Sequence, residues 1–215
     1  MTGEPQIKRA IAFFDGQNLF YAAREAFGYR YPNYDPIALA QVACQQGGWQ
    51  LAQVRFYTGV PDQRDDQFWN HFWVAKLGQM GREGVHTFSR ALRYRHQTVR
   101  LPDGSEQVAL IGQEKGIDIR IALDVVRLAH RREYDVGVIF SQDQDLSEVA
   151  EEIRVIAREQ NRYIKLCSAF PSSPTSRNTR GINKTDWLRI DRTTYTTCVD
   201  KRDYRPKQDQ KPDRP

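Results

Sequence analysis

The sequence predicts an α/β fold in which helices cover both faces of a mostly parallel central sheet. Segments with the apolar pattern of strands alternate along the chain with segments of helical periodicity, which is typical of β-α-β units. The strand-like segments are continuous apolar runs, such as residues 11–14, as expected for strands buried on both faces. The chain has 215 residues, 40% hydrophobic and 27% charged, which fits one globular domain of ordinary size.

The first half of the chain contains three expected strands and three expected helices. Asp35 and Pro36 are typical of the N-cap and first position of a helix, and Gly47 and Gly48 are typical of its end. In chain order we expect a strand over 7–14, helices over 18–27 and 35–44, a strand over 49–57, a helix over 65–80 and a strand over 85–92.

An excursion from this alternation is expected near residues 93–111. Two strand-like runs flank Pro102-Asp103-Gly104, whose backbone preferences favour a tight turn, so we expect a β-hairpin. The alternation then resumes with a helix over 115–132, a strand over 134–140, a helix over 145–159, and strands over 163–168 and 187–190.

The expected organisation is an N-terminal extension (1–6), one domain (7–191) and a disordered basic C-terminal tail (192–215). From Asp200 onward the chain is rich in charge and proline and poor in apolar residues, a composition typical of disorder.

Composition also narrows the class of protein. The formal net charge of +5 is compatible with a polyanionic partner but does not require one. The three cysteines are far apart and include no Cys-x-x-Cys pair, so we expect a cytoplasmic protein without a disulfide framework. Since no stretch approaches about 18 uninterrupted apolar residues, we expect no membrane as a partner.

Acidic residues gather where the expected strands end or where the helices after them begin. These residues are Asp15, Asp118, Asp143 and Asp145. The carboxyl ends of parallel strands and the helices that follow share one edge of the sheet, so we expect the four carboxylates to converge. Asp124 lies about 9 Å further along its expected helix and is left outside the site.

This clustering has a chemical interpretation. Carboxylates in one cleft repel each other, a cost that a divalent cation offsets. Oxygen ligands without histidine or cysteine favour Mg²⁺ or Mn²⁺, and such ions support the cleavage of phosphodiester bonds. The alternative is that each aspartate is only a helix cap or a turn residue, although four such coincidences at one edge are less expected.

Three motifs that contain these aspartates resemble those of NYN domains. Segment 14–18 (FDGQN) resembles the DGxN motif, segment 115–118 (KGID) resembles KGxD, and segment 141–145 (SQDQD) resembles SxDxD. NYN domains belong to the PIN-like nuclease superfamily, and the chain is most similar to its LabA-like group. The resemblance covers residues 7–168.

The resemblance implies a PIN-like three-layer α/β/α sandwich and an endoribonuclease that uses Mg²⁺ or Mn²⁺ to cleave RNA. The implied metal ligands and catalytic residues are Asp15, Asp118, Asp143 and Asp145, with support from Asn18, Lys115 and Ser141. The chain departs from the family pattern at Gln142, where glycine is common, and at Gln144; both departures concern the backbone shape of this loop.

Basic residues near the expected hairpin are candidates for RNA binding. They are Arg90, Arg93, Arg95 and Arg100, interleaved with Tyr94, and a second set contains Arg180 and Lys184. Arginine pairs with phosphate in a bidentate manner, and tyrosine offers a surface on which bases stack. The alternative is an ordinary solvated strand face.

Two other functions remain open at this point. One is a PIN-like module that binds RNA or protein without hydrolysis. The other is a phosphatase similar to haloacid dehalogenases, although Gln17 stands where that family needs a general acid. Trp69 and Trp73, four residues apart on one expected helix, are either buried or form a patch for a homo-oligomer.

Overall fold

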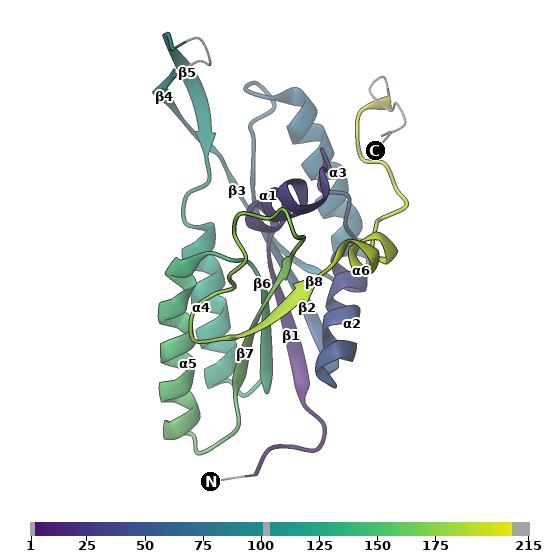
Figure 1. Cartoon of the computed structure of the whole chain (residues 1–215), viewed down its shortest axis with the longest axis vertical. Helices are drawn as coiled ribbons and strands as arrows, with labels where there is room; N and C mark the ends of the chain where they lie inside the picture. The colour runs from purple at the N-terminus through teal and green to yellow at the C-terminus, as the bar shows by residue number, and fades with distance from the viewer. Residues whose placement is uncertain (1–2, 101–103, 208–215) are drawn as a thin grey trace.

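Six parallel strands form the central sheet of the computed structural model, which describes residues 3–100 and 104–207 (Figure 1). In spatial order they are β3 (His86–Ala91), β2 (Gln50–Val60), β1 (Arg9–Asp15), β6 (Val136–Phe140), β7 (Lys165–Pro171) and β8 (Asp186–Ile190). Every neighbouring pair is parallel, so the expected parallel sheet is confirmed. The chain builds outward from β1 in both directions, which places the topological switch point between β1 and β6.

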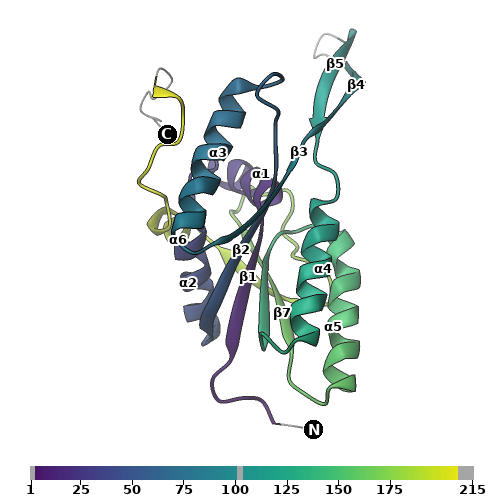
Figure 2. The same cartoon turned by 180° about the vertical axis from the view of Figure 1, so that it is seen from behind.

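Helices cover both faces of this sheet (Figures 1 and 2). One face carries α1 (Gly16–Phe27), α2 (Pro36–Gly47), α3 (Gln67–Arg82) and α6 (Arg192–Thr197), and the other carries α4 (Ile117–His130) and α5 (Ser147–Glu159). Alternate residues of β1 serve the two cores, with Phe14 on the α1 side and Phe13 on the α4 side. The three-layer sandwich is thus confirmed. Within the described ranges, no helix is both long and apolar enough to cross a membrane.

One helix is capped by the residue that the sequence predicts, and another begins differently from the prediction. Asp35 caps α2 by accepting hydrogen bonds from the backbone N–H groups of Ile37 (2.8 Å) and Ala38 (3.2 Å), as expected. The helix expected from Asp145 begins instead as a separate 3-10 turn, η1 (Gln144–Leu146), before α5. The side chain of Asp143 caps this turn.

The excursion after β3 is an antiparallel hairpin of β4 (Arg93–Arg100) and β5 (Glu106–Gln113), as expected. Figure 2 shows it extending beyond the end of the sheet at which β1 finishes. Two of the expected turn residues, Pro102 and Asp103, lie outside the described residues.

Residues 192–207, expected to belong to a disordered tail, are instead packed on the domain. Tyr195 of α6 is fully buried. The ring of Tyr204 lies 6.0 Å from that of Phe72 on α3. The composition was misleading because a few aromatic side chains, rather than a run of apolar residues, hold this segment in place. Residues 208–215, the rest of the expected tail, lie outside the described residues.

Candidate active site

Asp15 lies at the switch point of the sheet, where β1 ends and α1 begins. Its carboxylate accepts hydrogen bonds from the backbone N–H of Asn18 (3.1 Å) and from the hydroxyl of Ser141 (3.4 Å). Burial raises the pKa of Asp15 to about 6, and the nearby carboxylates of Asp143 and Asp118 add to this rise. Asp15 therefore caps a helix, as the alternative interpretation of the sequence predicts, and it also belongs to an acidic cluster.

The loop after β6 brings Asp143 to the same edge. Ser141 accepts a hydrogen bond from the backbone N–H of Asp143 (3.1 Å) while its hydroxyl donates to Asp15. Asn18 accepts a hydrogen bond from the backbone N–H of Gln142 through its side-chain oxygen (2.9 Å). Asn18 and Ser141 thus join the start of α1 to the loop that carries Asp143.

Glu114 is a further carboxylate at this edge, and the sequence reasoning missed it. Its Oε1 accepts hydrogen bonds from the backbone N–H of Gly59 and from the hydroxyl of Thr58 (3.4 Å). Burial raises the pKa of Glu114 to about 7, with contributions from the charges of Asp15 and Asp118. The close approach requires a glycine, because a Cβ at position 59 would lie 2.5 Å from Cγ of Glu114. The sequence feature that could have indicated Glu114 is its position directly before the KGID motif.

The expected aspartates are not equally close to this cluster. Asp118, in the first turn of α4, is half-buried and raises the pKa of both Asp15 and Glu114. Asp145 is exposed on η1, and its charge is not among the main causes of these two pKa shifts. Asp124 is buried and paired with three arginines, and its place outside the site stays a prediction.

Two basic side chains lie at the KGID motif. The guanidinium of Arg90, on β3, lies so close to Gly116 that a Cβ there would be 2.6 Å from its Nη1. Gly116 also has a φ of +76°, a conformation that favours glycine, and it precedes the first turn of α4. Lys115 is exposed and forms no ion pair with any described residue.

The basic residues of the hairpin do not share one surface. Arg93 and Arg95 lie on one face of the β4–β5 ribbon, whereas Tyr94 and Arg100 lie on the other. The division arises because neighbouring residues of a strand point to opposite faces, and the role of these residues in RNA binding stays a prediction.

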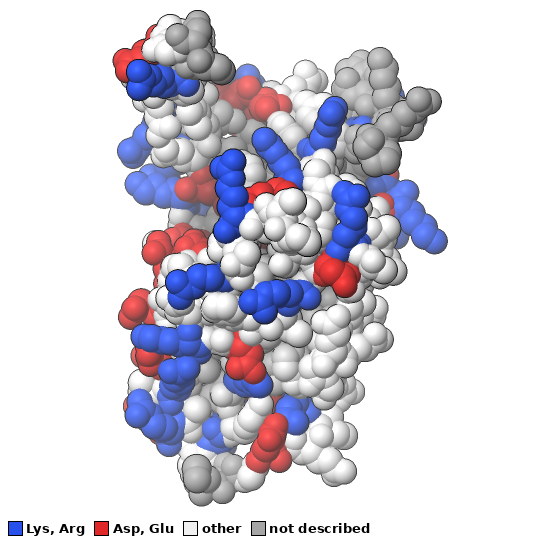
Figure 3. Space-filling view, in the orientation of Figure 1, with Lys and Arg blue, Asp and Glu red and all other residues white. Residues whose placement is uncertain are grey.

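The second basic set is also divided. The Nζ of Lys184 pairs with Glu151 on α5 at 2.5 Å, whereas Arg180 donates to the side chain of Asn183 (3.1 Å). Figure 3 shows Lys and Arg side chains spread over one face of the molecule, with Asp and Glu among them. This face has no continuous basic surface.

Gln142 and Gln144, the two departures from the NYN pattern, hold a loop against the acidic motif. The amide of Gln142 donates to the backbone carbonyls of Asn178 (3.1 Å) and Arg180 (2.9 Å). The amide of Gln144 donates to the carbonyl of Gly181 (3.0 Å). Side-chain hydrogen bonds therefore hold the polar segment after β7, next to the buried Ile182.

Comparison with known proteins identifies a family for this chain. A family model described as the NYN domain matches residues 9–179. The chain belongs to the NYN domain family. NYN domains are part of the PIN-like nuclease superfamily, which suggests a nuclease. The LabA-like subgroup stays a prediction.

Solved structures resemble this NYN domain at low identity. One is a protein of unknown function from Vibrio parahaemolyticus RIMD 2210633, which is 19% identical, with a TM-score of 0.50 over 89% of this chain and 98% of that chain. Another is MurG of Acinetobacter baumannii, 11% identical, with a TM-score of 0.33 over 85% of this chain and 45% of that one. The first likeness concerns the fold alone, and the second is too distant to carry an argument. A search of curated proteins found no match.

The acidic side chains of this NYN domain suit a hard divalent cation in kind, since all of them offer oxygen. Among the described residues, no three His, Cys, Asp or Glu side chains are arranged so that they could hold a metal ion by themselves. Mg²⁺ in phosphoryl-transfer sites needs only one or two carboxylates, because waters and substrate phosphates complete its shell. The residues therefore fit a cation that is shared with a substrate, and not one enclosed by protein ligands.

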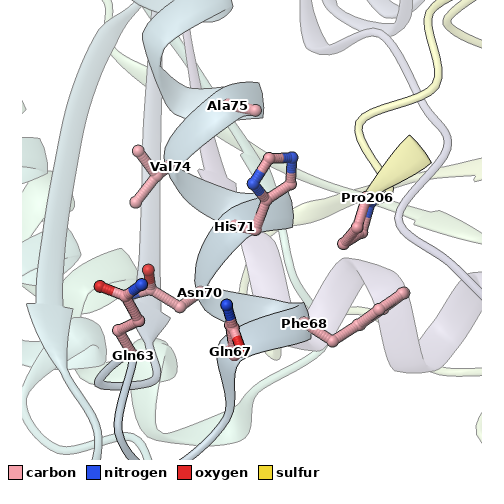
Figure 4. Close-up of a pocket in the computed structure, with 8 residues that line it drawn as sticks. All are labelled: Gln63, Gln67, Phe68, Asn70, His71, Val74, Ala75 and Pro206. Carbon is pink, nitrogen blue, oxygen red and sulfur yellow. The ribbon is translucent and has the colours of Figure 1, made fainter. Parts of the chain in front are cut away.

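Several cavities adjoin α3, and two of them bear on the argument. One, of about 500 Å³, lies between α1, α3 and the base of the hairpin. Its lining includes Gln17, which follows Asp15 by two positions, and Gly59, which donates its backbone N–H to Glu114. Another, of about 520 Å³, lies between a different face of α3 and Pro206 (Figure 4). Its lining includes no Asp, Glu, Lys or Arg, so we assign it no chemistry.

Proposed function

We propose that this NYN domain is an endoribonuclease that uses Mg²⁺ or Mn²⁺ to cleave RNA. The observation that carries the proposal is the meeting of Asp15, Asp118 and Asp143 with Glu114 at the switch point of the sheet. Burial and mutual repulsion raise the pKa of Asp15 to about 6 and that of Glu114 to about 7. Such a cluster destabilises the fold, and a bound cation would relieve the repulsion.

Asp15 and Asp143 would hold the cation, with Asp118 close to its water shell. When bound, the cation supplies a water of lowered pKa and stabilises the charge that develops on the phosphate. Asn18 and Ser141 keep the two ligands in place through the hydrogen bonds described above.

Glu114 would accept a proton from the attacking water. Its Oε1 is used by Gly59 and Thr58, whereas its Oε2 makes no hydrogen bond with any described residue. A carboxylate with a pKa of about 7 is well matched to this role, since general bases work best near the operating pH. Arg90 and Lys115 would bind the phosphate at the start of α4.

The test is cleavage of end-labelled single-stranded and structured RNA in the presence of Mg²⁺ or Mn²⁺. DNA of the same sequence is tested as a second substrate. Asp15→Asn and Asp143→Asn should each lower the rate by about 100-fold or more. Glu133→Gln, a change in the partly exposed loop before β6 at the other end of the sheet, is the control and should leave the rate unchanged. Equal rates in the wild type and both aspartate variants would refute the proposal. Binding of RNA without cleavage by either cation would support the binding module instead.

A further inference from the structure

The cavity between α1, α3 and the hairpin is not used by the chemistry proposed above. Five aromatic side chains line it, and we call it the aromatic groove: Phe20, Tyr21, Trp69, Trp73 and Tyr94. Its volume of about 500 Å³ lies within the range of roughly 300–1,000 Å³ that is typical of small-ligand sites.

The rings of the groove are partly exposed and held in place by their neighbours. The ring of Phe20 lies 6.2 Å from that of Trp69 and 5.5 Å from that of Tyr21, and Tyr21 is 54% exposed. Trp69 also contacts the rings of Tyr31 (5.8 Å) and Phe72 (5.3 Å), which fix its position. A flat ligand that stacks here would therefore meet a preorganised surface and order few side chains.

Charges on the groove differ between its two sides. Arg24 and Arg30 line it from α1 and the segment that follows, and neither forms an ion pair with a described residue. Asp65 and Asp66 line it from the start of α3, where Asp66 caps the helix by accepting from the backbone N–H of Trp69 (3.0 Å). A polyanion would be attracted to the arginine side and repelled from the aspartate side. Its phosphates would therefore follow the arginines, with its bases directed toward the rings.

Two residues that line the groove are neighbours of the acidic cluster. Gln17, which lines it, follows Asp15 by two positions on the same turn of chain. Gly59, which also lines it, donates its backbone N–H to Glu114. A strand bound in the groove would thus have its next phosphate close to the carboxylates.

We propose that the aromatic groove binds an unpaired base of single-stranded RNA beside the phosphate that is cleaved. This inference rests on the proposed function for the identity of the ligand. Stacking on aromatic side chains accepts any base, since every base has a flat π-face. A base inside an A-form helix already has both faces stacked, so a duplex cannot use the groove. The groove would therefore make this domain selective for single strands.

The test measures binding without cleavage. In an Asp15→Asn background, a short fluorescein-labelled single-stranded RNA of mixed sequence is titrated and its anisotropy is followed. Tyr21→Ala combined with Tyr94→Ala should weaken single-strand binding by about 5–150-fold, given about 1–3 kcal/mol for each stacked base. Affinity for a duplex of the same sequence should stay unchanged. Tyr21→Phe keeps a ring at this position and should bind like the parent protein.

A second pair of variants tests the arginine side and does not depend on the packing of the rings. Arg24→Gln combined with Arg30→Gln should weaken binding and reduce the slope of log K against log salt by about 0.7 for each lost contact. Arg131→Gln, at the far end of α4, is the matched control and should change neither value.

Tryptophan fluorescence gives an independent readout. Stacking of a base on Trp69 should quench part of the emission of the parent protein, and Trp69→Phe should remove that quenching.

The results separate this inference from the proposed function. If both the tyrosine and the arginine variants bind single strands as tightly as the parent protein, the proposed role of the aromatic groove is refuted, whatever the cleavage assay shows. If they bind weakly while the wild type cleaves nothing with either cation, the groove stands and the nuclease assignment fails.

Discussion

Replacing Asp15 by asparagine should stabilise this NYN domain at neutral pH while it removes activity. The folded pKa of Asp15 is raised to about 6 from an ordinary value of 3.8. Between these two pH values the folded protein holds a proton that the unfolded chain has lost. Stability therefore falls as the pH rises through this window, and the full loss persists above pH 6.

The two pKa values of Asp15 also set the size of the effect. Their difference corresponds to about 3 kcal/mol at 1.36 kcal/mol for each pH unit. Because Asp15 is coupled to Asp143 and Asp118, we expect asparagine to recover about 1–3 kcal/mol at pH 7.5. Asparagine keeps the size of the side chain and an oxygen for the N–H of Asn18, so the cap of α1 should survive. For a chain of this length the gain corresponds to a rise in Tm of about 2–12 °C.

The assay is thermal and urea unfolding of the wild type and Asp15→Asn from pH 4 to pH 8 in the absence of divalent cations. The two proteins should converge near pH 4 and separate as the pH rises. Glu133→Gln should follow the wild type throughout. A variant that is less stable than the wild type at pH 7.5, by the same amount at every pH, would show that Asp15 acts as a cap and not as a strained carboxylate.

Three further predictions concern other parts of the molecule. Mg²⁺ or Mn²⁺ should raise the Tm of the wild type, with a gain of about 2.7 kcal/mol at a hundredfold excess over Kd, and should leave Asp143→Asn unshifted in the same melts. Lys76→Met should destabilise the domain by about 3–5 kcal/mol in urea. The buried Nζ of Lys76 lies 3.6 Å from the carboxylate of Asp200 and donates to the carbonyl of Tyr34 (2.8 Å), and both would lose this partner; a loss under about 1 kcal/mol would contradict this. Gly59→Ala should cost about 1–3 kcal/mol in thermal melts and displace Glu114, so an unchanged pH profile of cleavage would argue against a role for that carboxylate.

Local patterns were sufficient to locate most of the acidic edge. The apolar run before Asp15 identifies the end of a buried strand, and the run before Ser141 identifies another. Parallel topology then places both ends at one edge, since every strand points the same way. Asp118 follows from the same rule, because the helix that begins at 117 must start at that edge.

Other parts of the site could not be predicted in this way. Glu114 reaches the cluster only because the returning strand of the hairpin packs beside Gly59, 55 positions earlier in the chain. The preference of strands for alternate faces separates Tyr94 from Arg95, but the face that meets α1 depends on how the hairpin docks. The C-terminal residues 192–207 are held by aromatic contacts, of Tyr195 with Phe27 on α1 and of Tyr204 with Phe72 on α3, which composition does not record.

The sequence by itself determined the alternation of strands and helices, the edge at which the acids meet and the type of chemistry that oxygen ligands support. These features depend on backbone preferences and apolar periodicity within short windows, which neighbouring residues encode. Only the tertiary structure decided the membership of the acidic cluster and the formation of the aromatic groove. Both depend on contacts between residues far apart in the chain, such as Gln142 with Arg180 and Glu114 with Gly59, and such contacts are set by the packing of whole elements. Burial, which raises the pKa of Asp15, likewise follows from that packing and not from the residues beside it in sequence.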